Sequence, residues 1–447
     1  MISQKFNINE LLAKLITLRN IDENKVYNYL NPNIAENLPN PFYLKDMKKS
    51  VERTYKAIIN NEKIAIIADY DVDGSSSAAI LYKFLKIVFK KPIIEVPDRL
   101  NDGYGPNNKI MNKLISNKVN LLFTLDCGTT SFDIFNNTKL KNIDTIIIDH
   151  HISEEKFPNV YSIINPNRFD EDSSYENLAA VGVTYLFLIA LRKFLREKKF
   201  FEKNQIKEPN LLQFLDLVAL GTVCDVVKLV DYNRVFVAKG LQIIHKRENQ
   251  TIRSIIDNSK LNTTPNISDI SFIIGPQLNA ASRISDSSLP SKILISEDIN
   301  EIDSISRKLF ILNEKRKLIE NQIFEEALSQ IDSHNNNNFI LVKGKAWHKG
   351  VLGIIASRLV EKYNKPAIVL SSDNKISVGS ARSINNLDLG TVILNSKRAG
   401  LLISGGGHKM AAGIKIQNNM INDFEIFLSK QFKNFEENIF KKINYFD

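Results

Sequence analysis

Short, nearly continuous apolar runs alternate with segments of helical spacing in the first part of the chain. The apolar runs are residues 64–68, 121–125 and 145–148, and the helix-like segments are residues 75–89, 109–116 and 131–138. Strands that are apolar throughout are buried on both faces, which is typical of parallel sheets with helices on either side. The pattern therefore predicts an α/β fold with a parallel sheet.

Helical periodicity dominates before and after this region. The first sixty residues and residues 178–244 carry apolar side chains at helical spacing. Residues 301–331 contain neither Gly nor Pro, so they predict one long helix or two abutting ones, ended by an asparagine-rich turn at residues 335–338. Between these regions, Gly275-Pro276 predicts a turn.

A second α/β pattern follows the long helix. It consists of an apolar strand at residues 339–342, a helix at Leu352–Tyr363, and strands at residues 367–370 and 375–379. We therefore predict a two-domain protein. Its parts are an N-terminal helical segment (1–60), a first α/β domain (61–300), a connector helix (301–335), a smaller α/β domain (336–420) and a C-terminal helix (421–447).

Acidic and imidazole side chains follow directly on the three strands of the first domain. They are Asp69, Asp71 and Asp73 after the first strand, Asp126 after the second, and Asp149, His150 and His151 after the third. Ligands of doubly wound sheets bind outside the carboxyl ends of the strands. We therefore expect these groups to meet at one edge of the sheet.

Such a cluster of carboxylates needs a positive counter-charge, because the groups repel one another. Oxygen-rich ligation with one or two imidazoles suits Mn²⁺ or Mg²⁺ better than Zn²⁺. Two such ions can share a carboxylate, activate a water and stabilise both oxygens of an in-line displacement at phosphorus. The strand-end groups therefore predict a metal-dependent phosphodiesterase.

Each of these groups also has a simpler interpretation when it is taken alone. A strand-end aspartate often caps the next helix, and Asp73 ahead of Gly74 fits that role. Asp225 lies in an apolar stretch at residues 219–227, where a carboxylate is costly unless it is paired or metal-bound. Asp225 is either a helix cap or a further metal ligand, and the strand-end cluster favours the ligand.

The second domain carries a different set of chemical groups. They are Ser380 and Arg382 after a strand, and the run Gly405, Gly406, Gly407 and His408 further on. Glycines let a backbone approach a phosphate closely, while Arg382 and His408 add charge and hydrogen-bond donors. The set predicts a cradle for a phosphate or a nucleotide backbone, although tight turns use glycine runs as well.

Composition and motifs narrow the class of protein. The 447 residues are 43% hydrophobic and carry a formal net charge of +9, which suits a multidomain globular protein but does not by itself decide for nucleic acid. The two cysteines, Cys127 and Cys224, imply no disulfide framework. No apolar run is long enough to span a bilayer and residues 1–5 lack a signal-peptide pattern, so we expect a cytoplasmic protein without a membrane partner. The sequence contains no P-loop, no dinucleotide-binding motif and no Gly-x-Ser-x-Gly motif. These absences disfavour, in that order, nucleotide triphosphatases, dehydrogenases and serine hydrolases.

The motifs together resemble a known family. Asp-Tyr-Asp-Val-Asp-Gly at residues 69–74, Leu-Asp-Cys-Gly-Thr-Thr-Ser at 125–131 and Asp-His-His at 149–151 are similar to the DHH phosphoesterase superfamily. Residues 221–225, 347–353 and 405–413 narrow the resemblance to the RecJ family of single-strand-specific 5′→3′ DNA exonucleases. The match runs from about Leu11 to Gly413, and residues 389–413 are most similar to alphaproteobacterial members.

The resemblance implies a role for each matching residue. The implied ligands of two Mn²⁺ or Mg²⁺ ions are Asp71, Asp73, Asp126 (shared by both ions), His150 and Asp225, with Asp69 as a further ligand or close neighbour. Asp149 would orient an imidazole, and His151 would contact the scissile phosphate or protonate the leaving group. The implied contacts to the 5′-terminal phosphate are Arg99, Arg283, Ser380, Arg382, Gly406, Gly407 and His408. Arg99 and Arg283 lie in loop-like contexts and, taken alone, resemble ordinary surface arginines.

The implied activity is release of 5′-mononucleotides from single-stranded DNA in recombination and repair, in a cleft between the domains that is too narrow for duplex. A single-strand-binding protein and a helicase are the implied partners. The alternatives are a phosphodiesterase for short oligonucleotides or nucleotides, and a scaffold that has lost catalysis. Because every ligand position is filled, the scaffold is disfavoured.

The chain departs from the family pattern in two regions. The family usually has arginine and glycine where this chain has Gln277 and Ser282, so we expect a weakened or rearranged phosphate grip around Arg283. Residues 414–447 predict a strand and an amphipathic helix and are too short for the OB-fold that follows in full-length members. We therefore expect weaker or less processive binding of single strands, with a truncated gene as the alternative explanation.

Overall fold

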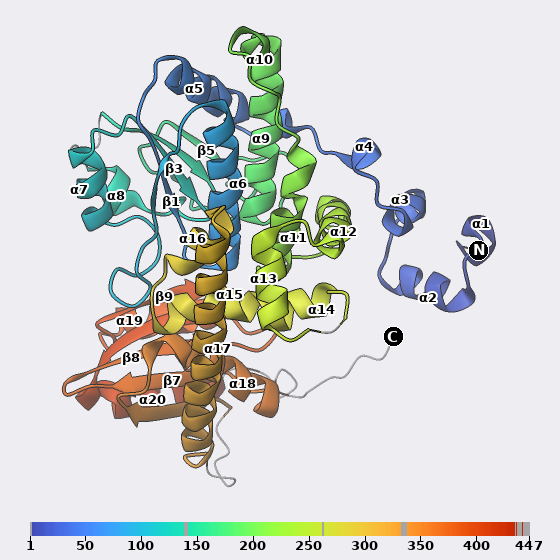
Figure 1. Ribbon diagram of the computed structural model, residues 1–447. Coiled ribbons are helices and arrows are strands. Elements are labelled where there is room, and N and C mark those ends of the chain that lie inside the picture. Colours follow the sequence, from blue (N-terminus) through green and yellow to red (C-terminus); the bar gives the residue numbers. More distant parts are fainter. Residues whose placement is uncertain are drawn as a thin grey trace. The chain divides into compact units, whose positions relative to one another are not determined.

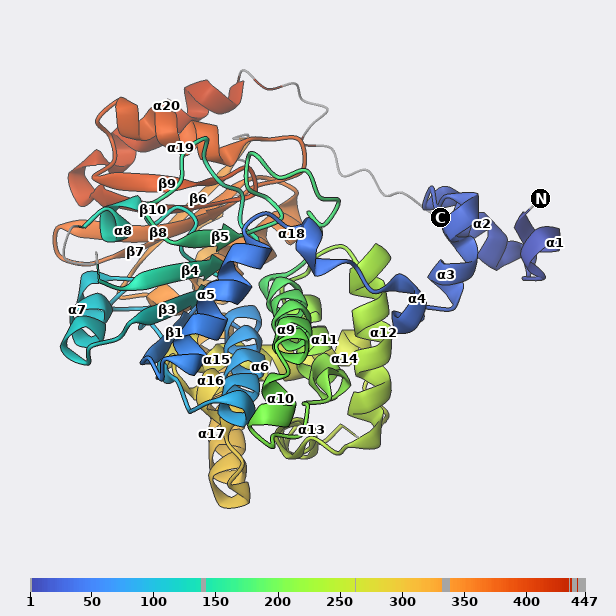
Figure 2. The same cartoon turned by 90° about the horizontal axis from the view of Figure 1, so that it is seen from above.

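A computed structural model describes residues 2–137, 142–261, 263–331, 338–433, 435 and 440 (Figures 1 and 2). The chain divides into two compact units, Met1–Leu312 and Asn313–Asp447. Most of the predicted turn at residues 335–338 and much of the predicted C-terminal helix beyond residue 433 lie outside the described residues.

The first unit contains a five-stranded sheet in which every pairing is parallel. Its strands, in the spatial order β2-β1-β3-β4-β5, are β1 (Ile64–Ala68), β2 (Ile93–Glu95), β3 (Leu121–Leu125), β4 (Asp144–Ile148) and β5 (Ser162–Ile164). The three apolar runs form the central strands β1, β3 and β4, and β1 and β3 are buried at every position. The predicted parallel sheet is confirmed, and the short edge strands β2 and β5 were not predicted.

Helices cover both faces of this sheet. The helices over one face are α5 (Met47–Ile59), α6 (Val72–Val88) and α9 (Ala180–Glu197), and those over the other are α7 (Asn108–Ser116) and α8 (Phe132–Phe135). Successive strand residues point to opposite faces. Ile66 and Phe123 therefore join the core under α6 and α9, while Ile67 and Leu122 pack under α7.

The remaining helices of the first unit come before or after this α/β layer in the chain. They are α1 (Ile2–Phe6), α2 (Glu10–Leu18), α3 (Val26–Leu30) and α4 (Ile34–Asn37) before the sheet, and α10 (Phe200–Lys203), α11 (Leu215–Cys224), α12 (Asp231–Lys246), α13 (Gln250–Asn258), α14 (Ile267–Asp269), α15 (Gly275–Ile284) and α16 (Leu289–Ile295) after it. Nearly every residue of α11 is buried, because this helix packs against α6, α9 and α12 at once. That packing fixes the position of Asp225, which directly follows α11.

The predicted turn at Gly275-Pro276 is wrong. The π-helical segment Ile270–Ile274 runs directly into α15, which begins at Gly275. Proline is tolerated in the first turn of a helix, where its missing N–H has no partner to lose. Arg283 consequently lies in the last turn of α15 and not in a loop.

The second unit is built on a mixed five-stranded sheet. Its strands, in the spatial order β6-β7-β8-β10-β9, are β6 (Ile340–Lys345), β7 (Ala367–Ser372), β8 (Ile376–Arg382), β9 (Ser404–His408) and β10 (Ala411–Gln417). Only the β6–β7 pair is parallel. The covering helices are α18 (Leu352–Tyr363) on one face, and α19 (Leu389–Arg398) and α20 (Ile421–Lys433) on the other. The glycine run at residues 405–407 therefore lies in an edge strand and not in a tight turn.

The predicted long helix is a single helix, α17 (Ile299–Leu328). Its first part packs Ile302 and Leu309 into the core of the first unit, and its last part packs Phe324 and Ala327 into a core of the second. Among the described residues, no helix is both long enough and apolar enough to cross a membrane.

The close contact between α11 and α12 gives a test of this packing. A Cβ atom at Gly240 would lie 2.2 Å from the Leu215 carbonyl oxygen and 2.3 Å from the Ala219 Cβ. Alanine is the better helix former by about 1 kcal/mol, but the clash dominates, so Gly240→Ala is expected to lower the free energy of unfolding by about 2 kcal/mol. Urea denaturation measures this, with Gly413→Ala as the control because a Cβ there meets nothing within 4 Å. A Gly240→Ala variant as stable as the parent would contradict the packing.

Candidate metal centre

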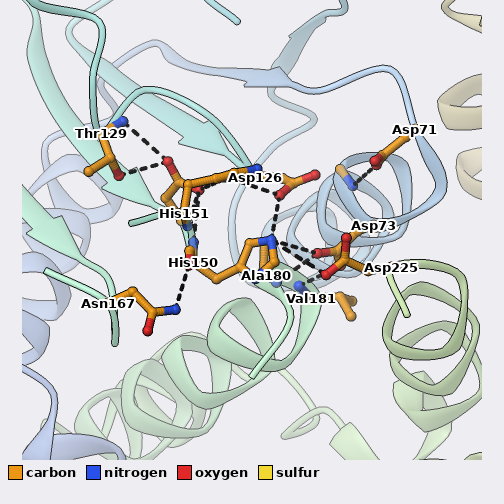
Figure 3. A network of polar contacts seen from close by, with 12 residues as sticks. Asp71, Asp73, Asp126, Thr129, His150, His151, Asn167, Ala180, Val181 and Asp225 are labelled. Atoms are coloured by element: carbon orange, nitrogen blue, oxygen red, sulfur yellow. Dashed lines mark hydrogen bonds and ion pairs between the residues drawn. The ribbon is translucent and has the colours of Figure 1, made fainter. Parts of the chain in front are cut away.

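Six acidic or imidazole side chains converge at the carboxyl edge of the first sheet. Figure 3 shows Asp71, Asp73, Asp126, His150 and Asp225 among them. Asp69 and Asp71 follow β1, Asp126 follows β3, and His150 follows β4; Asp73 lies in the first turn of α6 and Asp225 caps the end of α11. The strands β1, β3 and β4 are neighbours in the sheet, so the side chains that follow them meet.

The imidazole of His150 lies at the centre of this cluster. Its Nε2 is 3.4 Å from Asp126 Oδ1, 3.5 Å from Asp225 Oδ2 and 3.9 Å from Asp73 Oδ2. Ligand atoms within 4.8 Å of one another form three groups: Asp69, Asp71 and Asp126; Asp73, His150 and Asp225; and Asp126, His150 and His151. Asp126 belongs to the first and third groups, and His150 to the second and third, so Asp126 is the carboxylate that two groups share.

Three buried atoms of the cluster have no hydrogen-bond partner in the part of the chain that the structure describes. They are Asp69 Oδ1, Asp126 Oδ1 and His150 Nε2. A buried polar atom without a partner costs free energy. Divalent cations bound by these lone pairs would satisfy all three atoms, and the oxygen-rich donor set suits Mn²⁺ or Mg²⁺. The residues present therefore fit a divalent metal centre.

The pKa values of the cluster indicate the same need for positive charge. Burial, followed by repulsion from neighbouring carboxylates, raises the pKa of Asp69, Asp73 and Asp126 well above the usual range. The same two causes raise the pKa of Asp225 to about 7. Burial lowers the pKa of His150 to about 4, which keeps its imidazole neutral and available as a ligand.

Backbone contacts hold the two aspartates of α6. Asp71 is the N-cap of this helix, and its Oδ1 accepts a hydrogen bond from the Gly74 N–H at 3.0 Å. The capping role suggested for Asp73 thus belongs to Asp71. Asp73 accepts hydrogen bonds from the N–H groups of Ala180 at 2.7 Å and Val181 at 2.9 Å, at the start of α9. Negative charge is favoured at both helix N-termini.

Asp149 and His151 form a second arrangement beside the cluster. Asp149 accepts hydrogen bonds from the Thr129 hydroxyl at 2.7 Å and from His151 Nδ1 at 2.7 Å. Burial is the largest single influence on the pKa of Asp149 and raises it. The hydrogen bond from His151, the charges of His151 and His150 and the bond from Thr129 together exceed burial and hold the pKa of Asp149 below its usual range. Burial is also the largest influence on His151 and lowers its pKa, but the hydrogen bond to Asp149 and the surrounding negative charges together raise it to about 9. The His151 side chain is 49% exposed, so the imidazole can reach a bound substrate.

Several polar residues that no sequence motif singled out support the two histidines. Asn167 Nδ2 donates to the His150 carbonyl at 2.6 Å (Figure 3). Asn165 Nδ2 donates to the His151 carbonyl at 2.8 Å and to the Thr129 hydroxyl at 3.0 Å. Thr129 could have been found, because it lies just beyond Asp126 in a strand-end motif. Asn165 and Asn167 carry no such signal, since their role depends on the fold of the segment after β5.

The two arginines of the first unit that the resemblance implies as phosphate contacts, Arg99 and Arg283, lie near the metal cluster. The Arg99 guanidinium carbon is 4.9 Å from the centre of the Tyr70 ring, and the Arg99 N–H donates to Ser287 Oγ at 3.0 Å. Burial and the Asp69 charge raise the pKa of Tyr70 to about 12, and the positive charges of Arg99 and Arg283 oppose this shift. Both guanidinium groups therefore act on the same ring, next to Asp69 and Asp71.

The remaining predicted phosphate contacts lie in the second unit. Ser380 and Arg382 alternate along β8 and so share one face of the sheet, with Arg382 Nη1 at 3.5 Å from Ser380 Oγ. Ala411 pairs with both Arg382 and His408, which puts His408 on that same face. A Cβ at Gly353, near the start of α18, would lie 3.1 Å from Arg382 Nη2. These three polar side chains thus gather on one sheet face in the second unit.

Gln277 and Ser282, the two residues that depart from the family pattern around Arg283, are both buried. Gln277 is 2% exposed and donates to the Ser259 hydroxyl. Ser282 is fully buried and donates to the Asn279 carbonyl at 3.1 Å. Their side chains stabilise the surroundings of α15, so a change in the phosphate grip around Arg283 stays a prediction.

The carboxylate cluster predicts how metal-free stability depends on pH. A folded-state pKa of about 7 for Asp225 lies above the ordinary value of 3.8, so the folded state keeps a proton that the unfolded chain loses. Stability is then fully present below pH 3.8 and is lost as pH rises through 7; His151, raised to about 9, acts in the same direction. His150, lowered to about 4, acts oppositely but mainly below pH 6.5.

We therefore expect the melting temperature of the metal-free protein to fall between pH 6.5 and 8.5. Saturating Mn²⁺ should raise the melting temperature and flatten this dependence, because the cation replaces the lost protons. Differential scanning calorimetry with and without a chelator measures both effects. A metal-free melting temperature that rises over this range, or one that Mn²⁺ leaves unchanged, would contradict the electrostatic account.

Comparisons with known proteins agree with this geometry. The "DHH family, N-terminal domain" matches residues 63–222, and the "DHHA1 domain" matches residues 336–437. The single-stranded-DNA-specific exonuclease RecJ of Dickeya dadantii (strain 3937) is 34% identical over 387 residues, which cover 84% of this chain and 67% of that protein. The exonuclease of the same name from Escherichia coli (strain K12) is 33% identical over 394 residues, which cover 86% and 68%.

A solved structure is similar over most of both chains. It is the crystal structure of exonuclease RecJ bound to manganese, with a TM-score of 0.75 and 25% identity, covering 88% of this chain and 96% of that one. Sequence identity, domain matches and fold thus agree with one another. The chain belongs to the RecJ family of the DHH phosphoesterase superfamily.

Proposed function

We propose that this chain is a metal-dependent exonuclease that hydrolyses phosphodiester bonds of single-stranded DNA. The observation that carries the proposal is the cluster of carboxylates around His150, in a chain whose relatives are named as single-stranded-DNA-specific exonucleases. These relatives favour the exonuclease over a phosphodiesterase for short oligonucleotides. A role in recombination and repair, a cytoplasmic location, and a single-strand-binding protein and a helicase as partners remain part of the proposal.

The proposed ligands of two Mn²⁺ or Mg²⁺ ions are Asp71, Asp73, Asp126, His150 and Asp225, with Asp69 as a further ligand. Two ligand groups meet at Asp126, which supports its role as the shared carboxylate. When bound, the ions supply positive charge to the phosphate oxygens and lower the pKa of an attacking water. Asp71 and Asp73 accept hydrogen bonds from backbone N–H groups of helices, and these bonds hold both carboxylates in position before metal binds.

Asp149 and His151 would assist departure of the leaving group. The bond from His151 Nδ1 to Asp149 fixes the orientation of the imidazole, and a pKa of about 9 keeps the ring protonated at neutral pH. Its Nε2–H can then contact the scissile phosphate or donate to the departing 3′ oxygen. Asp149 is thus a positioning residue for His151.

The polar face of the second unit would hold the 5′-terminal phosphate, and Arg99 and Arg283 of the first unit remain further proposed phosphate contacts. The proposed contacts are Arg99, Arg283, Ser380, Arg382, Gly406, Gly407 and His408. A Cβ at Gly406 or Gly413 would meet nothing within 4 Å, so this sheet face is open to a bound backbone. Capture of a 5′ phosphate would set a 5′→3′ direction of digestion.

The metal assignment is tested by Asp126→Asn. Loss of the shared carboxylate should lower kcat on single-stranded DNA by about a thousandfold or more. It should also stabilise the metal-free protein, because one repelling charge is removed. Asp172→Asn is the control, since the Asp172 side chain is 89% exposed and lies in a surface ion pair. Activity near that of the parent would refute the assignment.

The direction of digestion is tested with single strands labelled at either end. Mononucleotides should appear first from the 5′ end, with little release from a duplex of the same sequence. Arg382→Ala should raise KM for a 5′-phosphorylated strand by about tenfold to a hundredfold, which corresponds to one charge-assisted hydrogen bond. Its effect on a 5′-hydroxyl strand should be smaller, and Arg196→Ala serves as the surface control. Equal effects on both strands would remove Arg382 from the 5′-phosphate site.

A further inference from the structure

Tyr104 lies in a loop beside the metal cluster, between Gly103 and Gly105, which have φ angles of +83° and +77°. Such backbone angles favour glycine, so the two neighbours permit a sharp local course of the chain. The residue Tyr104 is 49% exposed, yet its hydroxyl points inward. A loop tyrosine without a role would keep its polar end in water, because burying a hydroxyl is costly unless it is hydrogen-bonded.

The Tyr104 hydroxyl meets two groups of the site. It donates to the Asp126 carbonyl at 2.7 Å, and its oxygen lies 3.2 Å from His151 Nδ1. The Tyr104 and His151 rings also meet edge to face, with their centres 5.6 Å apart. Asp126 itself has a φ of +60°, so its backbone is held in the left-handed region where few residues other than glycine lie.

Counting donors and acceptors fixes how these groups are paired. An ionised carboxylate only accepts, so the 2.7 Å contact between Asp149 Oδ1 and His151 Nδ1 requires a proton on Nδ1. The single proton of the Tyr104 hydroxyl is donated to the Asp126 carbonyl, so a lone pair of its oxygen faces Nδ1–H. Asp149 and Tyr104 therefore both accept from the same N–H. Two acceptors on one side of the ring leave Nε2 free to act on the substrate.

We infer that Tyr104 is a further positioning residue of the exonuclease reaction, whose hydroxyl ties the His151 ring to the backbone of Asp126. Asp149 alone fixes one contact to the ring, and a single contact leaves the ring free to swing about it. The second contact links the His151 ring, through Tyr104, to the end of β3 that carries Asp126. The inference rests on the proposed function only for the reaction that His151 serves; the pairing of the side chains stands on the geometry.

The experiment compares Tyr104→Phe, His151→Ala and the double variant, with Tyr27→Phe as the control because Tyr27 is 61% exposed and far along the chain from these motifs. Two substrates are used: a dinucleotide, whose leaving 3′ oxygen needs a proton, and the p-nitrophenyl ester of thymidine 5′-phosphate, whose leaving group does not. Mn²⁺ affinity is measured by calorimetry, and folding by the melting temperature. The side-chain ¹⁵N–¹H signal of His151 Nδ1 is recorded by NMR in the metal-free protein.

Tyr104→Phe should lower kcat on the dinucleotide by about tenfold to a hundredfold, as a small misplacement of a reacting group does. KM, Mn²⁺ affinity and the melting temperature should change little. Each variant should lose more kcat on the dinucleotide than on the nitrophenyl ester. The ratio of these two losses should be the same for Tyr104→Phe as for His151→Ala. In the double variant, the Tyr104 change should add nothing to the His151 change, because both act through one ring.

Three results would overturn the inference. They are full additivity of the two changes, equal activity of Tyr104→Phe and the parent, and an Nδ1–H signal that is the same in the parent and Tyr104→Phe. If the parent cleaves neither these two substrates nor a single-stranded DNA oligonucleotide, the proposed function fails. The NMR comparison then still decides whether the Tyr104 hydroxyl holds the ring.

Discussion

Repulsion among buried carboxylates at the carboxyl edge of the parallel sheet is the constraint on which the first unit depends. Asp69, Asp73 and Asp126 are almost completely buried, and their pKa values are raised well above the usual range. Natural cores avoid such packing unless a counter-charge offsets it. The surrounding structure must therefore hold these carboxylates together against their mutual repulsion. A bound divalent ion would replace this repulsion by attraction and so stabilise the folded unit.

Rigid elements supply this restraint. The central strands are buried along their length and end at the cluster, so the side chains that follow them have little freedom. The N-termini of α6 and α9 donate N–H groups to Asp71 and Asp73. Asp225 arrives from a different direction, at the end of the fully packed helix α11. A site assembled in this way is preorganised before metal or substrate binds.

The sequence alone could predict what depends on local pattern. Continuous apolar runs predicted β1, β3 and β4, and the polar residues directly after them predicted most of the metal cluster. The turn predicted at Gly275-Pro276 was wrong, because proline fits the first turn of a helix as well as it fits a turn between elements. The site roles of Tyr104, Asn165 and Asn167 were not predicted, for another reason. Their contacts join segments that are distant in the sequence, and no periodicity of the chain encodes such pairings.

The most direct test of the central claim is an anomalous diffraction measurement on crystals grown with Mn²⁺, recorded at the manganese absorption edge. We expect two anomalous peaks, both among the carboxylates around His150, with Asp126 contacting each. One peak alone, or peaks only at surface carboxylates away from His150, would refute a two-ion centre shared by Asp126.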